Sequence, residues 1–196
     1  MPSLEHIRVA LAGFSPRILS IEGSQRAAVA VVLRETDDGV TILFIERAEQ
    51  EGDPWSGHMA FPGGRVDPGD AGPREAAERE AHEETAVDLS SAELLGRLDD
   101  LEGRGGHPGL VVSAFVYGVS EPGALVPNYE VREALWVPLD LLVDPARQVR
   151  YPFPPGASSH FPAILVGNER QVVWGLTYRF VEIMVGALGL ALPSSS

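Results

Sequence analysis

Runs of apolar residues bounded by turn signals predict a series of strands. The run at 26–33 is apolar without a break, which is typical of a strand buried on both faces. Asp37, Asp38 and Gly39 predict a hairpin turn into a returning strand. The expected strands are 26–33, 41–46, 92–101, 110–119, one that Pro138 ends and a short one at 163–166.

Three other segments place apolar residues at helical spacing or consist of strong helix formers. Residues 3–13 predict a short amphipathic helix, and residues 172–190 predict a long one. Residues 73–85 predict a helix of about three turns, because they contain no Gly or Pro after Pro73, and Pro is favoured in a first helical turn. We expect the side chain of Asp70 to cap this helix.

The order of these elements predicts one α/β domain. We expect an N-terminal helix and lead-in over 1–24, a single domain over 25–192 and a disordered tail over 193–196. Inside the domain, a short helix near 140–143 and an irregular crossing over 145–170, rich in Pro, Gly and Ser, precede the last helix. A length of 196 residues with 44% apolar residues suits this division.

The composition bears on the compartment and on the chemistry. The chain has no Cys, which excludes disulfides, thiolate metal sites and cysteine catalysis. Its first residues lack the basic and apolar regions of a signal peptide, so we expect a cytoplasmic protein. The last helix approaches a membrane span in apolar length, but Arg179 and Glu182 in its middle favour a location outside the membrane.

The charge limits the class of binding partner. A net charge of −13 argues against a sequence-independent nucleic-acid binder, because that binding needs basic surface to neutralise phosphates. A small phosphorylated substrate is compatible with this charge if bound cations screen it. All fifteen basic residues are Arg, so a guanidinium group would bind any phosphate. A homodimer stays open as the assembly.

The predicted helix at 73–85 carries three carboxylates on one face. Glu80, Glu83 and Glu84 share this face with Ala76 and Ala77. Like charges at this spacing repel, and a divalent cation would offset the repulsion. Mg²⁺ binds hard oxygen ligands and prefers a few carboxylates together with water and phosphate. For three glutamates alone, a solvated acidic helix face is the more frequent explanation.

The context of these glutamates favours the metal site. The chain resembles the Nudix box, G-x5-E-x7-R-E-U-x-E-E-x-G-U, through Gly64, Asp70, Arg79, Glu80, Glu83 and Glu84. It departs from the pattern by one extra residue before Arg79 and by Ala86 where the family usually has Gly. Both departures also occur in the coenzyme A pyrophosphatase-like branch of the family.

A second signature precedes the box and points to the same branch. Leu43, Arg47 and Ala48 resemble the L-x-x-R-A segment of the coenzyme A pyrophosphatase pattern, although three residues and not two separate Leu43 from Arg47, and 57–64 covers its G-H-x-A-F-P-G-G segment. The branch carries another Arg between the two segments, where this chain has Gly52, Asp53, Pro54 and Trp55. This departure puts the substrate in doubt but leaves the chemistry unaffected.

The resemblance implies a Nudix α/β/α sandwich with a central mixed β-sheet and a metal-dependent pyrophosphohydrolase. The expected reaction is cleavage of coenzyme A or acyl-CoA to 3′,5′-ADP and 4′-phosphopantetheine or its acyl form. The alternatives are ADP-ribose, NADH or a nucleoside triphosphate as substrate, and more remotely a non-catalytic Nudix-fold binding module. Mg²⁺ or Mn²⁺ is the expected cofactor, and the expected partner is a small nucleotide-derived molecule.

The resemblance also assigns site residues. The expected metal ligands are Glu80, Glu83 and Glu84, and the expected catalytic residues are Glu80, Arg79 and Glu130. The expected substrate-binding residues are Arg47, Phe61, Gly63, Gly64 and His107.

Two of these assignments leave alternatives open. Nudix enzymes often place a further Glu before a strand as metal ligand or general base, and Glu130 is the first candidate, with Glu133 second. A salt bridge from Glu130 to Arg132 or another neighbour is about as good an explanation. His107 lies in a glycine-rich connection that suits a binding loop, although a lone His in a loop is more often only solvated.

Overall fold

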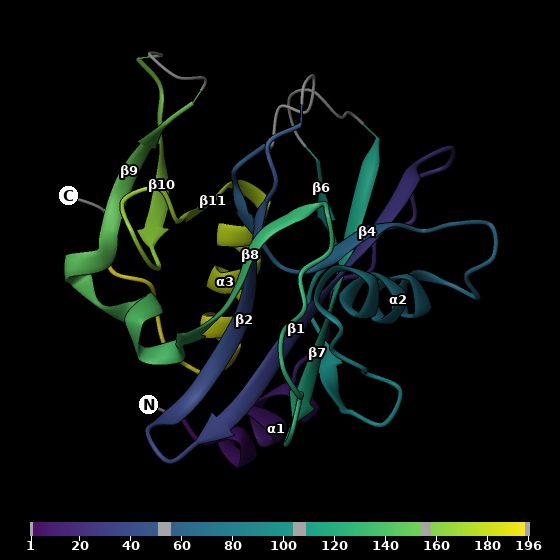
Figure 1. Cartoon of the computed structure of the whole chain (residues 1–196), viewed down its shortest axis with the longest axis horizontal. Coiled ribbons are helices and arrows are strands. Elements are labelled where there is room, and N and C mark those ends of the chain that lie inside the picture. The colour runs from purple at the N-terminus through teal and green to yellow at the C-terminus, as the bar shows by residue number, and fades with distance from the viewer. Residues whose placement is uncertain (1, 51–55, 104–108, 154–157, 195–196) are drawn as a thin grey trace.

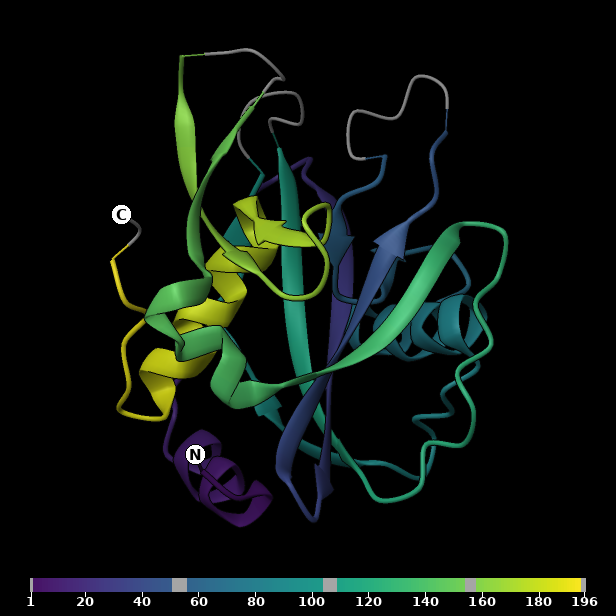
Figure 2. The same ribbon diagram turned by 60° about the vertical axis from the view of Figure 1, so that its left-hand side comes forward.

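A central mixed sheet lies between helices on its two faces (Figures 1 and 2). The structure is a computed structural model that describes residues 2–50, 56–103, 109–153 and 158–194. Helix α2 (Pro73–Thr85) covers one face, and α1 (Leu4–Ala12) and α3 (Gly175–Ala187) contribute to the core on the other. This arrangement is the predicted α/β/α sandwich.

The main sheet has eight strands, with β1 and β7 as its only parallel pair among the described residues. The strand order is β3-β2-β1-β7-β5, and β4, β6 and β8 pair with β1, β7 and β2. The bounds are β1 (Gln25–Thr36), β2 (Gly39–Arg47), β3 (Met59–Ala60), β4 (Gly63–Arg65), β5 (Glu93–Arg97), β6 (Leu101–Glu102), β7 (Leu110–Val119) and β8 (Val131–Pro138). One edge of β1 pairs with β7 over ten residues, whereas its other edge is shared by β4 and β2.

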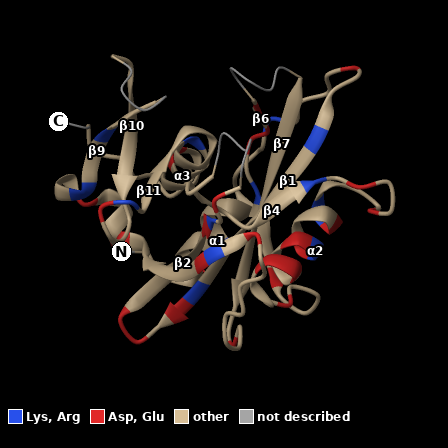
Figure 3. Ribbon diagram, turned by 45° about the horizontal axis from the view of Figure 1, so that its top comes forward, with Lys and Arg blue, Asp and Glu red and all other residues tan. Residues whose placement is uncertain are grey.

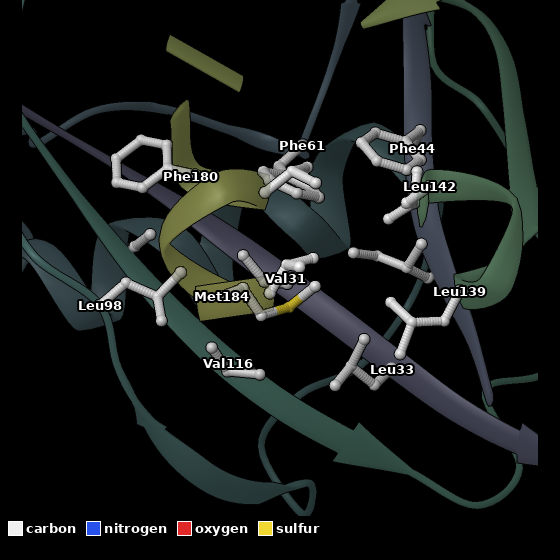
Figure 4. Packing of buried hydrophobic residues seen from close by; sticks show 14 of the residues in the cluster. Val31, Leu33, Phe44, Phe61, Leu98, Val116, Leu139, Leu142, Phe180 and Met184 are labelled. Atoms are coloured by element: carbon white, nitrogen blue, oxygen red, sulfur yellow. The ribbon is translucent and has the colours of Figure 1, made fainter. Parts of the chain in front are cut away.

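Strand β1 contributes to both cores because successive side chains point to opposite faces. Toward α2 it presents Ala28, Ala30 and Val32, which belong to the same buried cluster as the alanines of that helix. These small side chains let the helix pack close to the sheet. Toward α3 it presents Val31 and Leu33 (Figure 4). The expectation of a strand buried on both faces is confirmed.

Helix α2 has the predicted bounds, but its first turn differs from the prediction. Gly72 occupies the N-cap position without a side-chain cap, and Pro73 lies in the first turn as expected. Asp70 does not cap the helix, because its carboxylate binds the Arg79 guanidinium with Nε–Oδ1 3.0 Å. At the other end Ala86 adopts a left-handed conformation with φ 62°, which Gly would adopt with less strain.

The C-terminal third differs most from the prediction. The short helix expected near 140–143 is present as the 3₁₀ helix Leu139–Val143, but the crossing expected to be irregular over 145–170 contains a second 3₁₀ helix, Pro145–Arg147, followed by a three-stranded antiparallel sheet. Its strands are β9 (Gln148–Pro152), β10 (His160–Leu165) and β11 (Val172–Trp174). The long helix predicted from residue 172 begins only at Gly175, whose φ of 64° separates strand from helix.

Aromatic rings join the small sheet to the segment before β3. Trp174 contacts Tyr151 and Phe161 of the small sheet and Phe153, which directly follows β9, at ring centroid distances of 5.1, 5.7 and 4.6 Å. His58 meets the Trp174 ring edge to face at 5.0 Å. Such contacts stabilise beyond the area that they bury, so the small sheet is fixed to the main sheet at His58.

The N-terminal lead-in is fixed by two aspartates at a break in a predicted strand. Instead of one strand over 92–101, β5 and β6 are separated by Leu98, Asp99 and Asp100. Asp99 Oδ1 accepts the Arg17 N–H (2.8 Å), and the buried Asp100 carboxylate accepts the Leu19 N–H (2.9 Å) and pairs with Arg97 (2.6 Å). Forming these contacts interrupts the strand.

Two further sequence-based expectations concern the chain ends and membranes. The predicted tail 193–196 lies partly outside the described residues, and Leu192 just before it packs against the core. Within the described ranges, no helix has the length and apolar character needed to cross a membrane.

Candidate active site

The Gly63–Gly64 segment brings two carboxylates of α2 onto the edge of the sheet. As strand β4 it pairs antiparallel with β1, so that Gly63 lies opposite Val29. A Cβ at Gly63 would lie 2.3 Å from the Ala28 carbonyl oxygen, and the φ of Gly63 is 158°. Only Gly fits this position. Its N–H donates to Glu84 Oε2 at 2.8 Å, which ties the helix to the sheet edge.

Gly64 is required for a different reason. A Cβ on this residue would lie 2.3 Å from Oε1 of Glu80, and no backbone atom is among its three nearest neighbours. The absent side chain therefore makes the space that the Glu80 carboxylate occupies. The two glycines thus place two carboxylates of α2 on adjacent peptide units.

Arg79 connects the loop before α2 to the acidic face of the helix. Its guanidinium binds Asp70 through two nitrogens (3.0 and 3.1 Å), Glu80 at 3.0 Å and Glu83 at 3.3 Å. The hydrogen bond to Asp70 raises the pKa of Arg79, and the same contact lowers the pKa of Asp70. Arg79 is therefore placed to orient Glu80 and Glu83, as the resemblance implies.

The carboxyl group of Glu84 is buried, and few favourable interactions offset the loss of its hydration. Burial raises the pKa of Glu84 to about 8, opposed by the hydrogen bond from Gly63; the charges of Glu80 and Glu130 raise it further and that of Arg47 lowers it. Burial also raises the pKa of Glu80, against the hydrogen bond from Arg79. Figure 3 shows acidic residues gathered on α2. A cation would relieve this local excess of negative charge.

The predicted metal ligands differ in their surroundings. Glu80 and Glu84 are the two carboxylates at the glycines, whereas the Glu83 side chain is 52% exposed and pairs with Arg79. Among the described residues, no three acidic or His side chains form a closed metal-binding group. The donors are hard carboxylate oxygens in an incomplete set, which fits Mg²⁺ or Mn²⁺ because these ions take water and phosphate oxygens as further ligands.

Glu130 lies beside these carboxylates at the start of β8. Its charge is felt by both Glu80 and Glu84, and its N–H donates to Asn128 Oδ1 at 2.9 Å. Among the described residues Arg132 pairs with Glu46 (3.4 Å) and forms no ion pair with Glu130, whose carboxylate accepts a hydrogen bond from the neighbouring Tyr129 hydroxyl. This position suits a base or an additional ligand.

Glu133, the second candidate, is held away from that position. Its carboxylate accepts a hydrogen bond from the Gln171 amide at 2.7 Å. Gln171 also donates to the buried Glu46 at 3.2 Å. Glu133 therefore belongs to a polar contact between β8 and the residues before β11.

Arg47 lines a pocket of about 240 Å³ next to the carboxylates. The pocket lies at the end of β2, and its other lining residues include Ala48, Tyr129 and Glu130. A backbone hydrogen bond joins two of the lining segments, because the Ala48 N–H donates to the Glu130 carbonyl at 2.8 Å. Tyr129 was not predicted as a site residue. Its place directly before Glu130, the predicted base, could have indicated that it lies near the site.

Of the other predicted substrate-binding residues, Phe61 lies in the core and His107 falls outside the described residues. The expectation for Phe61 is wrong, because its side chain is 2% exposed and stacks on Phe44 in the core, with centroids 4.8 Å apart (Figure 4). A ring at this place between two packed layers cannot reach a substrate.

The two glycines should respond differently to a methyl group. Gly64→Ala should fold with little loss of stability, because the Glu80 side chain can rotate away, but its Mn²⁺ affinity should fall about tenfold or more. Gly63→Ala should lose about 2–4 kcal/mol of stability, since its Cβ meets backbone. Thermal unfolding and Mn²⁺ titration of both variants distinguish the roles. Normal Mn²⁺ affinity in Gly64→Ala would contradict the assignment of Glu80.

The buried carboxyl of Glu84 predicts a pH-dependent stability in metal-free protein. A pKa raised from about 4.3 in the unfolded chain contributes stability that is full below that value and is lost as the pH rises through about 8. Glu84→Gln keeps an acceptor for Gly63 and cannot ionise. With chelator present, its Tm should match wild type at pH 5 and exceed it by several degrees at pH 9, at about 2–4 °C per kcal/mol.

Glu83→Gln is the matched control for this measurement, because Glu83 is half exposed on the same helix. Its Tm should differ from wild type by a similar amount at both pH values. A Glu84→Gln difference that does not grow with pH would refute the buried, ionisable state of Glu84.

The family model described as NUDIX domain matches residues 24–156. An uncharacterized protein of Schizosaccharomyces pombe is 33% identical over an alignment of 162 residues that covers 71% of this chain and 49% of that protein. The chain thus spans about half the length of the curated relative that it matches.

Solved structures with this fold are more distant in sequence. A MutT/nudix family protein from Enterococcus faecalis is 19% identical, with a TM-score of 0.52 over 83% of this chain and 59% of that chain. The NUDIX domain of Shewanella oneidensis NrtR, solved with ADP ribose, is 22% identical, with a TM-score of 0.50 over 71% of this chain and 85% of that chain.

These two structures support the fold alone. The family match covers more than half of the chain and includes the glycines and the acidic helix of the site. The chain belongs to the Nudix family.

Proposed function

We propose that this protein hydrolyses a phosphoanhydride bond in a nucleoside diphosphate linked to a second group. The observation that carries the proposal is the placement of Glu80 and Glu84 on the adjacent peptides of Gly63 and Gly64. Glu80, Glu84 and Glu83 would hold Mg²⁺ or Mn²⁺, which when bound supplies activation of water and neutralisation of charge on phosphate oxygens.

The residues of the chain have separate tasks in this reaction. Arg79 keeps Glu80 and Glu83 in place through its hydrogen bonds and stays charged at any working pH. Glu130 is the candidate to accept the proton of the attacking water, because it lies near the carboxylates but is exposed. Water then forms the new P–O bond as the bridging P–O bond breaks.

The proposed substrate is coenzyme A or acyl-CoA. Support comes from the Arg47-Ala48 pair, from the G-H-x-A-F-P-G-G segment, and from the position of Arg47 in the lining of the pocket beside Glu130, where its guanidinium would bind a phosphate. Hydrolysis would give 3′,5′-ADP and 4′-phosphopantetheine or its acyl form. The absent second Arg is the reason to retain ADP-ribose, NADH and nucleoside triphosphates as alternatives.

Substitution of Glu130 tests the proton acceptor. Glu130→Gln should lower kcat by about 10²–10⁴ and change KM little, because a general base acts in the transition state. Steady-state kinetics with saturating Mg²⁺ measure both constants. Glu133→Gln is the matched control and should keep most of kcat, since Glu133 is bound to Gln171. A Glu130→Gln protein with lower Tm and normal kcat would indicate a structural role.

A panel of substrates tests the proposed specificity. The protein is incubated with Mg²⁺ or Mn²⁺ and coenzyme A, dephospho-coenzyme A, ADP-ribose, NADH or dGTP, and products are identified by mass. We expect the highest kcat/KM for coenzyme A, with 3′,5′-ADP as a product. A preference for ADP-ribose or NADH would reassign the substrate, and no hydrolysis of any compound would contradict the enzymatic function.

A further inference from the structure

Tyr129 is the most exposed of the large hydrophobic side chains described as exposed, at 86%. It lies in the connection from β7 to β8, directly before Glu130, and lines the pocket at the end of β2. An aromatic ring left in water at a turn adds nothing to the core. Exposed rings beside a pocket are typical of recognition, because they offer a large contact area at low entropic cost.

The backbone holds this ring in a defined place relative to the carboxylates. The N–H of Asn128 donates to the Glu84 carbonyl at 3.3 Å, and the Asn128 side chain accepts the Glu130 N–H at 2.9 Å. The Val131 N–H closes the turn on the Asn128 carbonyl. Tyr129 thus lies at the tip of a turn bound to the C-terminal part of α2.

The other walls of the pocket indicate what the ring contacts. Beside Tyr129 the pocket is lined by the side chains or backbone of Arg47, Glu49, Gln50 and Glu130. These polar and charged groups do not suit an aliphatic chain, whose burial would desolvate them without hydrogen bonds. They suit a planar base, because its edge carries hydrogen-bonding groups and its face stacks on an aromatic ring.

The charge of the walls distinguishes among bases. Two of the lining residues are carboxylates, which accept hydrogen bonds but cannot donate them when ionised. An exocyclic amino group, such as N6 of adenine, is a donor that matches them. A keto group that faces Glu49 would place its oxygen against an acceptor, whereas Arg47 and Gln50 can donate to the ring nitrogens of either base.

We infer that Tyr129 and this pocket form a subsite for the adenine base of the substrate, with the ring stacking on the base and the Glu49 carboxylate accepting from its amino group. The inference rests on the proposed function, since it assigns a place to the nucleoside half of the same substrate. It adds a specificity-determining residue to the hydrolytic site.

Direct binding of 5′-AMP tests the subsite without requiring turnover. Isothermal titration with Mg²⁺ present compares wild type, Tyr129→Ala and Tyr129→Phe, and 5′-IMP replaces 5′-AMP to test the amino group. Tyr129→Ala should weaken 5′-AMP binding about 5- to 150-fold, the range for loss of one base–aromatic stack. Tyr129→Phe should stay within about twofold of wild type, because it keeps the ring. Wild type should bind 5′-IMP more weakly than 5′-AMP.

Val126→Ala is the matched control, because Val126 is 61% exposed in the same connection and lies outside the pocket lining. It should bind 5′-AMP like wild type. Equal 5′-AMP affinity in Tyr129→Ala and wild type, or equal losses in Tyr129→Ala and Tyr129→Phe, would overturn the inference, as would undetectable binding to wild type. Hydrolysis by the same wild-type sample is assayed separately, so a failure of the enzymatic function is distinguished from a failure of the subsite.

Discussion

The approach of the α2 carboxylates to the Gly63–Gly64 backbone is the constraint on which the rest of the site depends. It requires β4 to pair with the first half of β1, since that pairing fixes the peptide that donates to Glu84. It also requires α2 to lie close to the sheet, which the alanines of β1 and α2 allow. A larger side chain at these packing positions would lift the helix and separate Glu84 from its donor.

The same approach makes the site electrostatically incomplete. Glu84 is buried with one backbone donor, and Glu80 shares Arg79 with Asp70 and Glu83, so positive charge is scarce where the carboxylates converge. In a chain of net charge −13, this scarcity extends over the surface of α2. The arrangement favours a cation and disfavours an unaccompanied phosphate, and binding of a metal together with an anionic substrate satisfies both conditions.

Helix and strand propensities, apolar periodicity and breaker residues were sufficient to predict the elements for which all of these agree. Helix α2 and strand β7 have the predicted bounds, because propensity, periodicity and breakers agree there. Of the small sheet only β10 was predicted, as a short strand at 163–166, because β9 is short and ends at a Pro and because Val172–Trp174 also fits the helical period of the residues that follow Gly175. Tertiary contacts decided the positions of the two side chains that were predicted wrongly. Asp70 binds the Arg79 guanidinium and does not cap the helix, and Phe61 packs in the core although it lies inside the motif. No single-sequence signal separates a motif residue that packs from one that binds.

The parallel pairing of β1 with β7 has a consequence for how the chain folds. Gln25 pairs with Leu110, so the central ladder joins segments that have the whole Gly63–Val87 stretch between them. Closing so long a loop is slow relative to helix formation and to the β1–β2 hairpin, whose strands are separated by a short turn. During synthesis from the N-terminus, the glycines and the acidic helix are available before β7 exists. The sheet that supports the site is therefore completed after the residues of the site have been made, and β1 stays an unprotected edge until then.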